Sequence, residues 1–173
     1  MIFIKIFLFL RRLARLYKKL IRENENQKQI FDVLAYIVNN SIQVSLEEFK
    51  EDMNDKEIIQ NNYSFAGCCI FINTTKNKFY VEKSDCVSLN LIGHINGEIY
   101  NSPVSQDIID GDDFKLRLIP LSDFVINSLE QAGLLSSPRL SYLEQLELSL
   151  IYYHNFRYPR SYNLNKVTIT SLK

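Results

Sequence analysis

The first 22 residues place apolar and basic side chains with the period of a helix. Apolar residues recur every three or four positions, which is the spacing of one helical face: Phe3, Ile6, Phe7, Leu10, Leu13, Ala14, Tyr17, Leu20 and Ile21. Basic residues fall largely elsewhere: Arg11, Arg12, Arg15, Lys18, Lys19 and Arg22. The pattern predicts a basic amphipathic helix over residues 1–22.

Three hypotheses remain for this predicted helix. Its wholly apolar part is about ten residues long, short of the roughly 20 that a membrane span needs, so we expect no transmembrane span. The basic block follows the apolar part, whereas it precedes it in a secretory signal. The helix could dock on its own domain or a partner, lie on nucleic-acid phosphates, or act as a membrane-surface or targeting helix.

The rest of residues 1–62 predicts a helical extension. The polar stretch ENENQKQ separates the first helix from a second apolar-periodic one, IFDVLAYIV. An acidic segment over residues 45–60 follows, which predicts a solvated helix or linker. We expect a second unit over residues 63–173.

From residue 63 the pattern becomes mixed. The β-branched and aromatic runs AGCCIFIN and KFYVEKS, joined by TTKN, predict a hairpin. A helix ending near Gly97, a loop over SPVSQDIIDGDD, a strand at FKLRLIP, an ill-defined segment and a helix from Tyr142 follow. Strands followed by helices predict the α+β class.

Charge and cysteine content add two expectations. The chain has twenty basic and twenty acidic residues, but every charged residue before Glu23 is Lys or Arg, so the remainder is net acidic. Cys68, Cys69 and Cys86 form neither a disulfide framework nor a zinc pattern, which indicates a reducing compartment.

Two glutamates interrupt the apolar face of the last predicted helix. Glu144 fits a capping box with Ser141. Glu147 falls between Leu143 and Ile151, near the middle of the apolar stripe. A buried carboxylate is costly unless it is paired, hydrogen-bonded or bound to a metal, so Glu147 is a candidate functional residue.

Residues from about Ala66 to Leu164 resemble the GIY-YIG nuclease family. The family's Gly-Ile-Tyr corresponds to Gly67-Cys68-Cys69, and its Tyr-Ile-Gly to Tyr80-Val81-Glu82. Its helical arginine and histidine correspond to Asn90 and His94, and its closing asparagine to Asn163 in RSYNL. The family glutamate falls on Glu147.

The resemblance implies a small three-stranded antiparallel sheet flanked by helices. It implies vestigial catalytic positions at Tyr80, His94, Glu147 and Asn163, and substituted positions at Cys69, Glu82 and Asn90. Glu147 would be the sole protein ligand of Mg²⁺, and no cofactor is expected unless activity survives. Without the first tyrosine and the arginine, we expect a very poor nuclease or none.

The expected function is therefore binding. We expect a degenerate nuclease-fold protein that serves as a nucleic-acid-binding or structural component of a larger assembly, such as an organellar ribosome or another ribonucleoprotein. The expected partners are nucleic acid, RNA rather than DNA, and protein subunits of that assembly, and the expected location is mitochondrial. Arg157 and Arg160, in a Tyr-rich segment, join the six basic residues of the predicted helix as nucleic-acid contacts.

Two alternatives stay open. The first is an active Mg²⁺-dependent endonuclease of the homing type, in which Tyr100, Arg117 or Lys83 replaces the missing groups. The second is a protein–protein interaction module whose first helix docks in a partner's groove.

Overall fold

The computed structural model describes residues 2–99, 102–135, 137–155, 157 and 160–163, and of residues 2–20 and 160 it describes the backbone alone. Its elements are, in chain order, α1 (Ile2–Asn39), β1 (Ile42–Ser45), α2 (Leu46–Asp52), α3 (Lys56–Asn62), β2 (Gly67–Asn73), β3 (Lys78–Ser84), α4 (Val87–Ile95), α5 (Pro103–Ile109), β4 (Phe114–Pro120), α6 (Asp123–Gln131), α7 (Tyr142–Asn155) and β5 (Arg160–Ser161).

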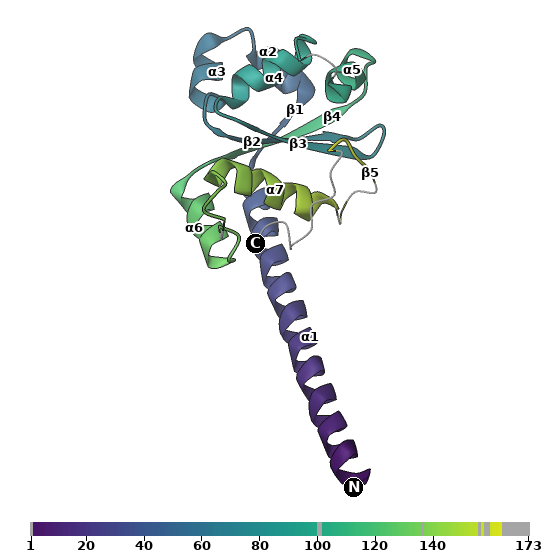
Figure 1. Ribbon diagram of the computed structural model, residues 1–173. Coiled ribbons are helices and arrows are strands. Elements are labelled where there is room, and N and C mark those ends of the chain that lie inside the picture. The colour runs from purple at the N-terminus through teal and green to yellow at the C-terminus, as the bar shows by residue number, and fades with distance from the viewer. Residues whose placement is uncertain (1, 100–101, 136, 156, 158–159, 164–173) are drawn as a thin grey trace.

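One sheet organises the domain, in the strand order β1-β4-β2-β3-β5 (Figure 1). The first four of these strands pair antiparallel, and the two-residue β5 pairs parallel to β3. The α+β class is confirmed, and so are the predicted strands β2, β3 and β4. The expected number of three strands is wrong because β1 and β5, at the two edges, are too short to show an alternating pattern.

Helices cover both faces of the sheet (Figure 1). The C-terminal part of α1, together with α6 and α7, covers one face, and α2, α3, α4 and α5 cover the other. All seven residues of the central strand β2 are buried. Because side chains alternate along a strand, Cys68 and Ile70 join the first core, whereas Cys69 and Phe71 join the second.

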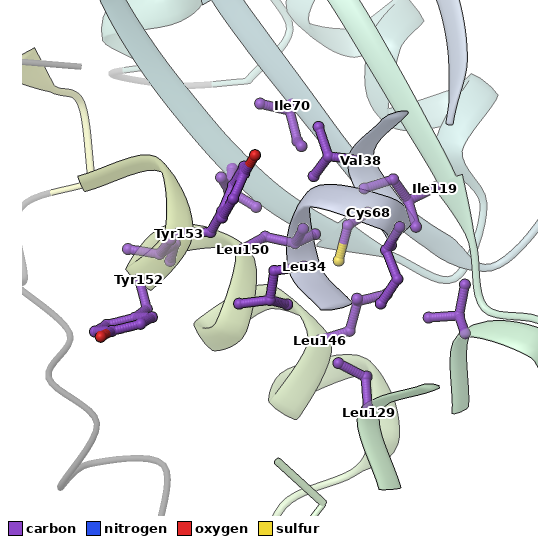
Figure 2. Packing of buried hydrophobic residues seen from close by; sticks show 14 of the residues in the cluster. Leu34, Val38, Cys68, Ile70, Ile119, Leu129, Leu146, Leu150, Tyr152 and Tyr153 are labelled. Carbon is purple, nitrogen blue, oxygen red and sulfur yellow. The ribbon is translucent and has the colours of Figure 1, made fainter. Parts of the chain in front are cut away.

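The first core joins α1 to α7 (Figure 2). Leu34 and Val38 of α1 and Leu146 and Leu150 of α7 gather around Cys68 of the central strand. All five side chains are at most 2% exposed. This contact fixes the C-terminal part of α1 to the domain.

The helix α1 is continuous over 38 residues, where the sequence pattern predicts two helices separated by ENENQKQ. Glu, Gln and Lys are good helix formers, and no Gly or Pro precedes Gly67, so nothing in the polar stretch ends the helix. Residues 21–29 are exposed, and burial begins at Ile30. The N-terminal half extends away from the domain (Figure 1). No helix in the described part of the chain has the length and apolar character needed to cross a bilayer.

Residues 30–62 contribute to the same cores as the sheet. Val44 in β1 and Leu46 and Phe49 in α2 are buried beside β2 and β4. The acidic segment over residues 45–60 is therefore two short helices, of which α2 is anchored by its apolar side chains, and not a wholly solvated linker.

The remaining predicted elements between residues 66 and 155 are confirmed, apart from the loop before β4. The hairpin, the helix α4 with Gly97 just beyond its end at φ +69°, and the helix α7 are confirmed. The expected loop before β4 is wrong, because Pro103–Ile109 forms α5. Ser102 caps this helix through the Ser105 amide, and Pro103 stands at its start, where its missing N–H costs nothing.

Candidate functional site

The edge of β3 brings together residues from three distant parts of the chain. Beyond the short pairing with β5, the backbone of β3 is satisfied by side chains. Asn163 accepts from the Val81 amide at 2.9 Å and donates to the Val81 carbonyl at 2.9 Å. Glu147 accepts from the Lys83 amide at 3.3 Å. The two residues thus close an otherwise open sheet edge.

Glu147 is half-buried on α7. Burial raises the pKa of its carboxyl, and the negative charges of Glu82 and Glu144 act in the same direction, although the Lys83 amide and ammonium oppose them. Lys83 itself is paired with Glu144, with 3.0 Å between Nζ and Oε1. Glu144 forms the predicted capping box with Ser141, which is confirmed.

On the opposite face of β3, Glu82 and His94 form a close pair. The Glu82 carboxylate and the His94 Nε2 atom are 2.7 Å apart. The His94 Nδ1 atom is 3.1 Å from the hydroxyls of both Ser102 and Ser105. With the carboxylate ionised and the imidazole neutral, this arrangement has Nε2–H donating to Glu82 and a serine hydroxyl donating to Nδ1. The imidazole side chain is 1% exposed and has both nitrogens engaged.

Tyr80 lies beside this pair. Its ring centroid is 6.0 Å from that of His94 and 6.1 Å from that of Phe71. Burial, followed by the charges of Glu82 and Glu147, raises the pKa of Tyr80 to about 12. The phenol therefore stays protonated at neutral pH and cannot serve as a base without a change in its surroundings.

The substituted positions carry no replacement chemistry. Cys69 is 1% exposed, and burial raises the pKa of its thiol well above the usual range, so no thiolate forms there. Asn90 lies one turn before His94, and its Oδ1 atom is buried without a hydrogen-bond partner among the described residues. A neutral amide at this position supplies no positive charge for a phosphate.

Among the other predicted residues, Arg160 lies in β5, whose backbone pairs with β3 at Lys78. Arg157 stacks on the Tyr153 ring, with 4.7 Å between the guanidinium carbon and the ring centroid, and Arg22 is exposed on α1. The side chains of Arg11, Arg12, Arg15, Lys18, Lys19 and Arg160 lie outside the described residues.

Of the two candidate replacement residues that the structure describes, Lys83 lies beside Glu147 and Arg117 does not. Arg117 donates to the Val38 carbonyl at 2.9 Å, on the α1 side of the sheet. Tyr100 lies outside the described residues. The Lys83 ammonium acts on Glu147 through its charge, but it is already paired with Glu144.

The described residues offer few further ligands to a metal ion at Glu147. Among the described residues, no three His, Cys, Asp or Glu side chains come together in a way that could hold a metal ion. Glu147 offers one carboxylate, so a hard cation there would depend on water and phosphate oxygens for its remaining ligands.

A second polar cluster, absent from the sequence predictions, closes the other end of the hairpin. The Asn73 amide donates to Asp107, Asp112 and the Tyr162 hydroxyl. Lys76 Nζ lies 2.8 Å from both carboxylates. The Tyr162 hydroxyl also donates to Asp107. These residues are up to 89 positions apart in the sequence, and no local signal predicts their contact.

The chain matches no known protein-family profile, no curated protein and no solved structure.

Proposed function

We propose that this chain acts by binding and not by cleavage. Its nuclease-like domain would be a structural component of a larger assembly, and α1 would be the element that attaches it. The observation that carries this proposal is the closed Glu82–His94–serine cluster, in which the histidine that resembles the family's catalytic one has no free nitrogen.

The surroundings of this cluster support the proposal. Phosphodiester cleavage needs an aligned nucleophile and positive charge facing the transition state. Here Cys69 is buried, Asn90 is neutral, and Glu82 and Glu147 both place negative charge around Tyr80. An incoming phosphate would be repelled at this edge of the sheet.

The uneven distribution of basic and acidic residues along the chain supports α1 as the element that attaches the domain to its partner. Seven of the twenty basic residues lie before Glu23, whereas none of the twenty acidic ones does. The remaining chain is net negative and is a poor general binder of polyanions. RNA is the polyanion that the nuclease resemblance suggests, and its affinity would come from the N-terminal half of α1.

A cleavage assay tests the proposal. Plasmid DNA and structured RNA are incubated with Mg²⁺ or Mn²⁺ and the native chain, Glu147→Ala or Glu144→Ala, the last being a matched loss of a carboxylate on the same helix. We expect no metal-dependent product from any of the three. Cleavage by the native chain and by Glu144→Ala that is lost in Glu147→Ala would refute the proposal and identify an enzyme.

Docking of a protein partner is a second candidate, favoured by the surface between α1 and α6. Tyr36 and Phe124, which are 56% and 46% exposed, meet edge to face there with ring centroids 5.6 Å apart. They border a cavity of about 720 Å³ that Val33 also lines. Apolar docking at this place resists salt, whereas phosphate contacts weaken steeply with it, so pull-downs at low and high salt separate the two candidates.

A further inference from the structure

The N-terminal half of α1 confines its basic residues to three positions of a seven-residue repeat. With Phe3 at position a of a seven-residue repeat, every Lys and Arg among residues 1–22 falls at b, c or f. Every a, d, e and g position from Ile2 to Ile21 is apolar. Because α1 is helical throughout this range, these positions form one basic face and one wide apolar face.

No helix or strand in the described part of the chain lies beside this half of α1. Figure 1 shows this half of α1 extending clear of the domain, and residues 21–29, which link it to the core, are exposed. A long helix draws most of its stability from packing an amphipathic face. The wide apolar face therefore calls for a surface outside the domain.

A coiled coil with a second copy would cover only part of this face. Such a seam uses two of the seven positions and leaves b and f in water. Nine of the first ten residues are apolar, which places Ile4 at b and Leu8 at f as well. A helix that is apolar all round belongs in a core or in lipid.

RNA would likewise satisfy one face alone. The seven basic residues could meet its phosphates, but the apolar positions would stay in water. A bilayer satisfies both faces, because Lys and Arg on one face and Phe and Leu on the other are typical of helices bound at a membrane surface.

We propose that the N-terminal part of α1, over residues 2–22, binds the surface of an anionic lipid bilayer. The apolar positions enter the acyl region, and the basic positions lie among the headgroups. The inference rests on the proposed function only in that α1 is the attaching element; it names an anionic lipid surface, in place of RNA, as the partner of this helix. The exposed segment 21–29 would link the domain to the membrane.

Flotation of the full chain with vesicles tests this inference. Vesicles of phosphatidylcholine alone are compared with vesicles that also contain phosphatidylserine, at low and high salt. We expect the chain to float with the anionic vesicles, less with the neutral ones, and to float partially at high salt because apolar insertion persists.

The decisive variant is the pair Leu13→Gln and Leu20→Gln, both at d positions. Gln matches Leu in helix propensity, so the change removes apolar area without disfavouring the helix, and we expect at least about tenfold weaker vesicle binding. Leu89→Gln on α4, where the native side chain is 68% exposed, makes the same chemical change on the domain and should float as the native chain does. An unchanged melting temperature shows that the variants are folded.

Three results would overturn the inference. These are flotation of the double variant equal to that of the native chain, RNA binding without vesicle binding, and oligomers that the double variant dissociates while no form binds vesicles. The cleavage assay is independent. An active nuclease that floats refutes only the proposed function, and an inactive chain that fails to float refutes only the membrane contact.

Discussion

Glu144 and Glu147 lie one turn apart on α7 in opposite electrostatic situations. Hydrogen bonds from Ser141 and the Lys83 ammonium hold the pKa of Glu144 at about 2. Burial instead raises the pKa of Glu147 above its ordinary 4.5. Folding therefore favours the charge on Glu144 and disfavours the charge on Glu147.

Glu147→Gln is expected to raise the melting temperature near neutral pH. Gln keeps an oxygen to accept the Lys83 amide and removes the unfavourable charge. A carboxyl with a raised folded-state pKa costs stability as pH rises above the unfolded value, so the gain should vanish below about pH 4.5, where both states are protonated. Thermal melting across this pH range measures it.

Glu144→Gln is the matched comparison and should lower the melting temperature near neutral pH. The contribution of its depressed pKa is present above the unfolded value of 4.5 and is lost as pH falls toward about 2. Equal changes in melting temperature for the two substitutions at neutral pH would contradict the opposite pKa shifts of Glu144 and Glu147.

At this scale the sequence identified single residues but not their contacts. The interrupted apolar stripe singled out Glu147, and the Ser141–Glu144 spacing predicted a capping box that the structure contains. The pairing of Glu82 with His94 was not predictable, because it depends on how α4 packs on β3. Ser102 and Ser105 reach His94 only because α5 forms.

At the scale of elements, α1 divides into a buried and an exposed part. Its last turns contribute Leu34, Ile37 and Val38 to the core, whereas residues 21–29 are exposed. The stability of the domain should therefore depend on the buried last turns of α1 and not on its exposed part.

Gln27→Pro should break α1 without unfolding the domain. Proline inside a helix costs about 3 kcal/mol locally, but residue 27 makes no core contact, so the melting temperature of the domain should hardly move while the far-ultraviolet helical signal decreases. Leu34→Ala, in the buried part, should cost about 2–5 kcal/mol of unfolding free energy. A large loss of domain stability in Gln27→Pro would show that the exposed part supports the fold.

The elements that the sequence predicted correctly are those with long patterns. Seven-residue strands and the 14-residue α7 carry enough periodicity to be recognised. The four residues of β1 and the two of β5 do not, and they become strands because β4 and β3 offer edges to pair with. Residues 23–29 look like a break but continue α1, since polarity alone does not end a helix.

At the scale of the whole molecule, the two cores lie on opposite faces of the central strand β2. Cys68, Ile70 and Ile72 of β2 face α1 and α7, and Cys69 and Phe71 face the helices of the other layer. Loss of either layer would expose one face of β2 to water. The layers should therefore unfold together.

Leu34→Ala in one core and Phe49→Ala in the other test this coupling. Each should cost about 2–5 kcal/mol and shift a single transition, with far- and near-ultraviolet circular dichroism coinciding in urea. Separate transitions for the two probes would show that the layers are independent.

The sequence by itself determined the class, most of the long elements and the segregation of charge along the chain, because these follow from periodicity and composition within short windows. Tertiary structure alone decided the edge strands, the single long α1, the closed Glu82–His94 cluster and the Asn73–Asp107–Tyr162 network. Each of these depends on residues far apart in sequence becoming neighbours, and such contacts form only when burial of the shared cores holds the elements together.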